Sequence, residues 1–187
     1  MRLRAAAFAV LIVLVATTAA SAAGGHVAIV DGEVSRRDAV WYLGLRVDYR
    51  LSDAAEEALR NGVALELRLD IEVLQPRWIW WEETVAQLAQ RYRLRYHALS
   101  ERYVLVRLNS GESRSFRSLR VLLDEVGRVR SLPIIDAELL RAGVAYTVAV
   151  RASLDTDALP RPLRAMAYIS PQWQLASDWQ RWPLHDS

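Results

Sequence analysis

Apolar and polar residues alternate along much of the chain, and this alternation predicts its strands. In residues 63–73 every odd position is apolar, while four of the residues between them carry a charge. A period of two places such apolar side chains on one face of a half-buried strand. Residues 43–51 and 144–154 repeat the pattern, and residues 27–34 form a shorter, less regular case. The chain is therefore predicted to be mainly β.

Two short helices are predicted between these strands. Ser52 or Asp53 can cap a helix that stops near Gly62, and a second helix is expected over residues 116–126 with Ser115 as its N-cap. Both are too short to cover a sheet, so one sheet must pack against another. The expected fold is a two-layer antiparallel β-sandwich, immunoglobulin-like in outline, with two or three short connecting helices.

A hairpin is predicted over residues 91–108. Pairing Leu94 with Val106 and Tyr96 with Val104 brings the large apolar side chains together on one face. That register requires an odd loop of three or five residues, although the segment lacks the glycine that such loops prefer.

Two nearby runs supply a candidate binding surface, one rich in tryptophan and the other an alternating ladder of cations. Its members, called the Trp–Arg surface below, are Trp78, Trp80, Trp81, Glu83, Arg91, Arg93, Arg95 and His97. Exposed indoles stack on sugars, lie at membrane interfaces or anchor protein partners. A structural role is the alternative, with the indoles covering core ends and the ladder pairing with Glu66, Asp70 and Glu72.

The first 23 residues have the pattern of an export signal. Arg2 and Arg4 precede an uncharged run over residues 5–16, and small residues follow up to a cleavage site after Ala22. Residues 1–22 are therefore expected to be a signal peptide, and residues 23–187 a single periplasmic domain. If residues 5–23 are not cleaved, they would instead anchor the protein in the inner membrane, and only then is membrane contact expected.

The composition excludes cysteine chemistry and argues against nucleic-acid partners. The chain has no cysteine, which excludes disulfides and a lipoprotein thiol. All 24 basic residues are arginines, and without Arg2 and Arg4 they equal the 22 acidic residues. A formally neutral, exported domain gives no support to nucleic-acid binding.

The C-terminal segment, residues 155–187, is rich in tryptophan. Pro160 and Pro162 predict a rigid extended link, and Trp173, Trp179 and Trp182 are expected to pack back onto the body. Aspartates at 155 and 157 resemble part of a calcium loop, but its glycine and remaining oxygen ligands are missing. No metal site is expected.

The residue types needed for catalysis form no recognisable motif. There is no thiol, His-Glu-x-x-His sequence, glycine-rich phosphate loop or nucleophile elbow, and the three histidines have no ligand spacing. We expect no catalytic residues and no cofactor. A hydrolase using Glu82 or Glu83 with a distant acid is the remaining enzymatic alternative.

Several motifs carry a family resemblance. They are Pro76-Arg77-Trp78, Trp81-x-Glu83-Thr84, the run 90–99, and an ending over 175–184 that holds Trp179 and Trp182. Over roughly residues 29–184 the chain resembles the proteobacterial exported proteins grouped as domain of unknown function 4390. That resemblance implies export and a gene neighbourhood containing a two-component sensor kinase, with no catalytic residues to carry over.

Two functional hypotheses follow. The first is a non-catalytic periplasmic module that binds an envelope protein through the Trp–Arg surface, the sensor kinase being a candidate suggested by resemblance alone. The second is a module that binds a small envelope ligand, such as a saccharide or a lipid headgroup, by indole stacking and arginine hydrogen bonds.

Overall fold

The structure of the protein, a computed structural model, describes residues 24–77 and 81–185, the side chains of Arg77 and Trp81 excepted. The predicted signal peptide over residues 1–22, and its alternative as an anchor over residues 5–23, lie outside the described residues. Trp78 and Trp80 lie outside them as well.

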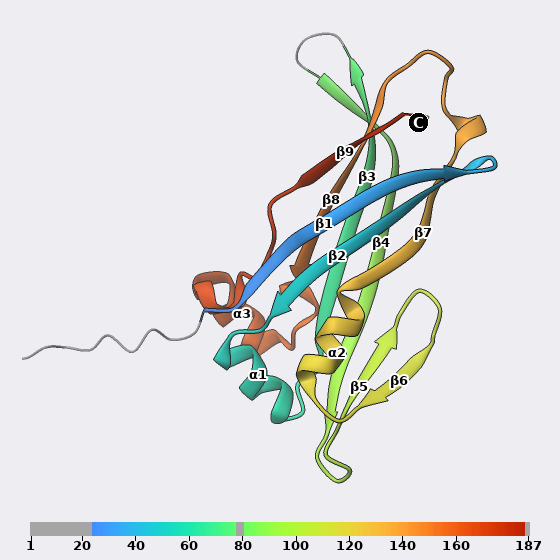
Figure 1. Cartoon of the computed structure of the whole chain (residues 1–187). Helices are drawn as coiled ribbons and strands as arrows, with labels where there is room; N and C mark the ends of the chain where they lie inside the picture. Colours follow the sequence, from blue (N-terminus) through green and yellow to red (C-terminus); the bar gives the residue numbers. More distant parts are fainter. Residues whose placement is uncertain (1–23, 78–80, 186–187) are drawn as a thin grey trace, which may run out of the picture.

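Two antiparallel sheets form the body, as the alternation predicted. One has the strand order β1-β2-β7, with β1 (His26–Arg37), β2 (Val40–Arg50) and β7 (Arg128–Asp136). The other has the order β6-β5-β4-β3-β8-β9, with β3 (Leu65–Arg77), β4 (Trp81–His97), β5 (Arg102–Arg107), β6 (Ser113–Phe116), β8 (Tyr146–Leu154) and β9 (Gln180–Leu184). Figure 1 shows β1 and β2 crossing in front of the long strands β3, β4 and β8. The two-layer β-sandwich is confirmed.

The core lies between the inward faces of the two sheets. On β3 the five odd-numbered apolar residues from Leu65 to Val73 are at most 1% exposed, while the charged residues between them face outward. On β2 the inward set runs from Trp41 to Tyr49 at alternate positions and is also buried, at no more than 6% exposed. Burying each such side chain stabilises the fold by roughly 1.5–3 kcal/mol. A one-residue slip in strand pairing would turn these side chains outward, so their burial fixes the register of the strands.

Three helices lie at one end of the sandwich: α1 (Asp53–Arg60), α2 (Leu119–Val126) and α3 (Arg161–Ile169). The short 3-10 turns η2 (Thr156–Ala158) and η3 (Pro171–Trp173) flank α3 in the chain, and a third turn, η1 (Ala137–Leu139), follows β7 at the other end. Of the two caps predicted for α1, Ser52 is the N-cap and Asp53 lies in the first turn. The Ser52 Oγ accepts the Ala55 N–H at 3.3 Å and donates to the Gln172 carbonyl at 2.6 Å. The same hydroxyl therefore joins α1 to the C-terminal segment.

The predicted start of α2, at residue 116, is wrong. Phe116 closes β6 and pairs with Tyr103, so the chain is still extended where a helix was expected. The helix begins at Leu119, and its N-cap is Ser118 rather than Ser115. Pairing with β5 overrides the local helical pattern in this segment.

The extended link predicted at Pro160 and Pro162 is also wrong. Pro160 is the N-cap of α3, and Pro162 lies in its first turn. Proline is tolerated there because the first N–H groups of a helix have no partner within the helix.

The register predicted for the β4–β5 hairpin is wrong as well. His97 pairs with Arg102, so the loop contains four residues, 98–101, rather than three or five. Leu94 consequently lies opposite Leu105 instead of Val106. In the absence of a glycine, Glu101 takes the left-handed conformation, with a φ of 50°.

The inward set on β5 follows from this register. Tyr103, Leu105 and Arg107 share the face of Tyr92 and Leu94, and Leu105 is only 1% exposed. Alternation alone could not choose between this set and the even-numbered one, because every residue from Tyr103 to Val106 is apolar.

The C-terminal segment closes one side of the sandwich. Trp173 is buried and Trp182 half-buried, whereas Trp179 remains 39% exposed. Through β9, Trp182 lies directly over Gly32 of β1, where a Cβ atom would come within 2.4 Å of the indole. The edge of the six-stranded sheet at β9 therefore meets the edge of the three-stranded sheet at β1. The opposite edges, β6 and β7, both contact α2.

Candidate functional site

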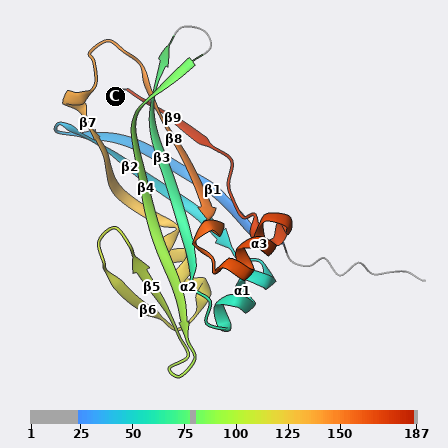
Figure 2. The ribbon, with the colours of Figure 1, turned by 180° about the vertical axis from the view of Figure 1, so that it is seen from behind.

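The cationic ladder of the Trp–Arg surface runs along the outer face of β4. Arg91, Arg95 and His97 are exposed, and Arg93 is half-buried between them. Figure 2 views the molecule from behind, with β4 in front of the three-stranded sheet. Of the three tryptophans in the Trp–Arg surface, only Trp81 falls within the described residues, where it begins β4.

Glu83 lies on the same strand but does not share the face of the ladder. A register shift between Val73 and Leu74 of β3 places Thr84 opposite Leu74, on the outer face, and Glu83 opposite Gln75. The outer face receives Glu82 instead, whose Oε1 lies 2.7 Å from Arg181 Nη1 on β9. The local bulge thus separates Glu83 from the arginines with which the sequence grouped it.

One of the ion pairs expected for the ladder is present. Glu66 Oε1 accepts from Arg93 Nε at 2.9 Å and from Nη2 at 2.7 Å. Asp70 instead pairs with Arg68 on its own strand, at 2.6 Å, and Glu72 accepts from Gln87 at 3.4 Å. The pair of Arg93 and Glu66 fixes the centre of the face.

The other three ladder residues are available to a partner. Within the described part of the chain, the side chains of Arg91, Arg95 and His97 make no hydrogen bond or ion pair. On β5, half-buried Val104 lies opposite Arg95, and Val106 lies opposite Arg93. The face therefore combines exposed cations with apolar side chains.

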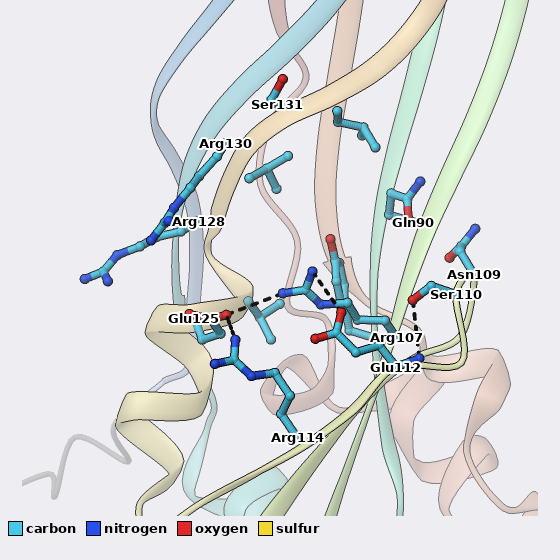
Figure 3. A pocket seen from close by; sticks show the side chains of 14 residues that line it. Gln90, Arg107, Asn109, Ser110, Glu112, Arg114, Glu125, Arg128, Arg130 and Ser131 are labelled. Atoms are coloured by element: carbon cyan, nitrogen blue, oxygen red, sulfur yellow. Dashed lines mark hydrogen bonds and ion pairs between the residues drawn. The ribbon is translucent and has the colours of Figure 1, made fainter.

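A second site lies on the side of the sandwich away from Trp182, as a cleft of about 670 Å³ between β4, β5, α2 and β7. Its charged lining residues are Arg107, Glu112, Arg114, Glu125, Arg128 and Arg130. Figure 3 shows the first four pointing toward one another from separate elements, whereas the side chains of Arg128 and Arg130 extend away from them. The sequence analysis missed this cleft, because the wrong hairpin register turned Arg107 outward.

The charges in the cleft are only partly paired. Glu125 forms a close ion pair with Arg114 and lies 3.4 Å from Arg107 Nη2. Glu112 is farther from Arg107, with Oε2 3.7 Å from Nη1. Below these atoms Arg107 Nε is buried and has no hydrogen-bond partner in the described structure. The Nη1 and Nη2 atoms of Arg107 thus make only long contacts, and its Nε makes none.

Tyr92 forms part of the cleft wall beside Arg107. Burial raises the pKa of Tyr92, and the charge of Arg107 partly opposes that rise. The phenol is therefore neutral at physiological pH and cannot neutralise the guanidinium.

No group of three or more histidine, aspartate or glutamate side chains in residues 24–77 and 81–185 is arranged to hold a metal ion. None of the helices in these residues is both long and apolar enough to cross a bilayer.

Comparison with protein families gives one match. Residues 25–183 match the model of a family described as Domain of unknown function (DUF4390). No curated protein and no solved structure matches the chain.

Proposed function

The chain belongs to the DUF4390 family, and on that premise we propose that it is a non-catalytic binding module of the cell envelope. Its partner is a protein, held on the outer face of the six-stranded sheet. Export is inferred from the N-terminal sequence pattern, and a sensor kinase as partner from the family resemblance.

One observation carries this proposal: Arg91, Arg95 and His97 are exposed along one strand and have no partner among the described residues. Arginine is enriched at protein interfaces because its planar fork forms paired hydrogen bonds and its stem packs on apolar surface. Val104 and Val106 supply apolar contacts beside these cations. The matching partner surface carries carboxylates around an apolar centre.

Saccharide or headgroup binding by the indoles is the weaker proposal. It depends on Trp78 and Trp80, which lie outside the described residues, and on the Trp81 side chain. The ladder by itself supports a broad charged interface better than a sugar site, because its exposed cations are spread along one strand.

Affinity capture from envelope extracts tests the partner. The variant Arg91→Ala/Arg95→Ala/His97→Ala should recover at least about tenfold less partner than the wild-type domain, since several interface cations are lost together. Its thermal stability should change little, because exposed side chains without partners contribute within about 0.5 kcal/mol each.

The matched control is Arg46→Ala/Arg120→Ala, which removes two exposed arginines from β2 and α2. It should capture the partner at the wild-type level. Equal recovery by the ladder variant and the wild type, or equal loss in the control, would contradict the proposal.

A further inference from the structure

We propose that the cleft between β4, β5, α2 and β7 binds a small organic oxyanion with an apolar chain, through the guanidinium of Arg107. The relevant group is a carboxylate or a phosphate, since both present the paired oxygens that a guanidinium fork accepts. This site lies between the two sheets and is distinct from the ladder on the outer face.

The charge of the cleft favours an anion once Glu112 is displaced. Four arginines and two glutamates line it, but Arg128 pairs with Asp124 at 2.6 Å, and the side chains of Arg128 and Arg130 extend away from the central cluster (Figure 3). Arg107 and Arg114 therefore face Glu112 and Glu125 as two positive against two negative charges. Displacement of the exposed Glu112, which contacts Arg107 only at 3.7 Å, leaves one positive charge for a bound oxyanion.

The hydrogen-bonding capacity of Arg107 is not fully used by its protein partners. Contacts of 3.4 and 3.7 Å are longer than the 2.7–2.9 Å typical of charged hydrogen bonds, and Nε has no partner. A buried unpaired donor is unfavourable, so an oxyanion that lets the side chain turn and use Nε would gain affinity. Glu112 is the weaker competitor for that position because it is half-exposed and farther away.

The walls supply the preference for an apolar chain. Val126 is buried, and Val129 and Leu132 are half-buried on the sides that line the cleft. Asn109 is not available for recognition, because its side chain joins the β5–β6 turn to β4 through bonds to Arg91 N and Ala89 O. A volume of about 670 Å³ is within the range of small-molecule sites.

Titration followed by amide chemical shifts tests the site, using inorganic phosphate, butyl phosphate, hexyl phosphate and hexanoate as probes. Affinity should rise roughly fourfold per buried methylene, so hexyl phosphate should bind more tightly than butyl phosphate and far more tightly than inorganic phosphate. Comparison of hexyl phosphate with hexanoate then identifies the preferred oxyanion. The shifts should be concentrated at cleft residues such as Ser110 and Val129.

Three variants separate binding from folding. Arg107→Lys keeps the charge but loses the fork, and should weaken hexyl phosphate binding at least about tenfold. Glu112→Gln removes the competing carboxylate and should strengthen binding several-fold, an outcome that loss of structure cannot produce. Arg120→Ala, an exposed arginine of α2 outside the cleft, should bind as the wild type does.

Absence of saturable shifts with every probe would overturn the proposal. So would shifts that lie outside the cleft, affinity independent of chain length, or equal binding by wild type, Arg107→Lys and Glu112→Gln.

Discussion

Replacing Leu105 with alanine should destabilise the domain by about 2–5 kcal/mol. Leu105 is 1% exposed, on the inward face of β5 opposite the fully buried Leu94. The substitution removes three carbons from the core and leaves a cavity that the two sheets cannot fill. Chemical denaturation of the purified domain, followed by tryptophan fluorescence, measures the change.

Val106→Ala is the matched control. Val106 lies on the outer face, half-buried opposite Arg93, and its truncation should cost no more than about 1 kcal/mol. The odd-loop register expected from the sequence predicts the reverse order, with Val106 in the core and Leu105 outside. A larger loss for Val106→Ala than for Leu105→Ala would therefore contradict the hairpin described here.

Gly127→Ala should cost about 3 kcal/mol, although the backbone at this position has an ordinary φ of −67°. A Cβ atom there would lie 2.1 Å from the Val47 carbonyl oxygen of β2. Neither group can move easily, because Val47 N donates to Gly127 O at 2.8 Å and Gly127 N donates to Leu123 O at 2.9 Å. To make room for the methyl group, β2 would have to move away from the end of α2 and the start of β7.

The control is Gly24→Ala, where a Cβ atom meets nothing within 4 Å. Thermal unfolding of both variants measures the difference, and Gly24→Ala should melt within a few degrees of the wild type. A Gly127→Ala protein with the same midpoint as Gly24→Ala would show that β2 and α2 are not packed this closely.

Alternation was sufficient to predict the central strands. The odd positions of residues 63–73 contrast so strongly with the charged positions between them that only one face can be buried. The same contrast is absent from residues 103–106, which are all apolar, and there the sequence left the inward face undetermined. The four-residue loop and the left-handed Glu101 decided the register instead.

Local patterns failed where partners distant in sequence compete for the chain. Phe116 was expected in a helix but pairs with Tyr103, and Pro162 was expected in an extended link but lies in the first turn of α3. At Phe116, strand pairing outweighs the local helical pattern. At Pro162, the first turn of a helix tolerates proline, so the residue does not prevent helix formation.

The two sites differ in how far the sequence could predict them. The ladder could be read directly, because residues at alternate positions of one strand must share a face. Glu83 left that face only because of the bulge opposite Leu74. The cleft could not be predicted, because Arg107, Arg114 and Glu125 come from β5, β6 and α2, and the patterns within these segments do not show that they lie side by side.

Site-specific photocrosslinking in intact cells tests the proposed binding face most directly. A photoreactive residue at Ser115 lies on the outer face, opposite Val104 and next to the ladder, and leaves every arginine in place. A residue at Arg46 on β2 reports the opposite layer. The proposed function predicts one reproducible envelope-protein adduct from position 115, absent from position 46 and lost with Arg91→Ala/Arg95→Ala/His97→Ala. No adduct from position 115, or the same adduct from position 46, would contradict it.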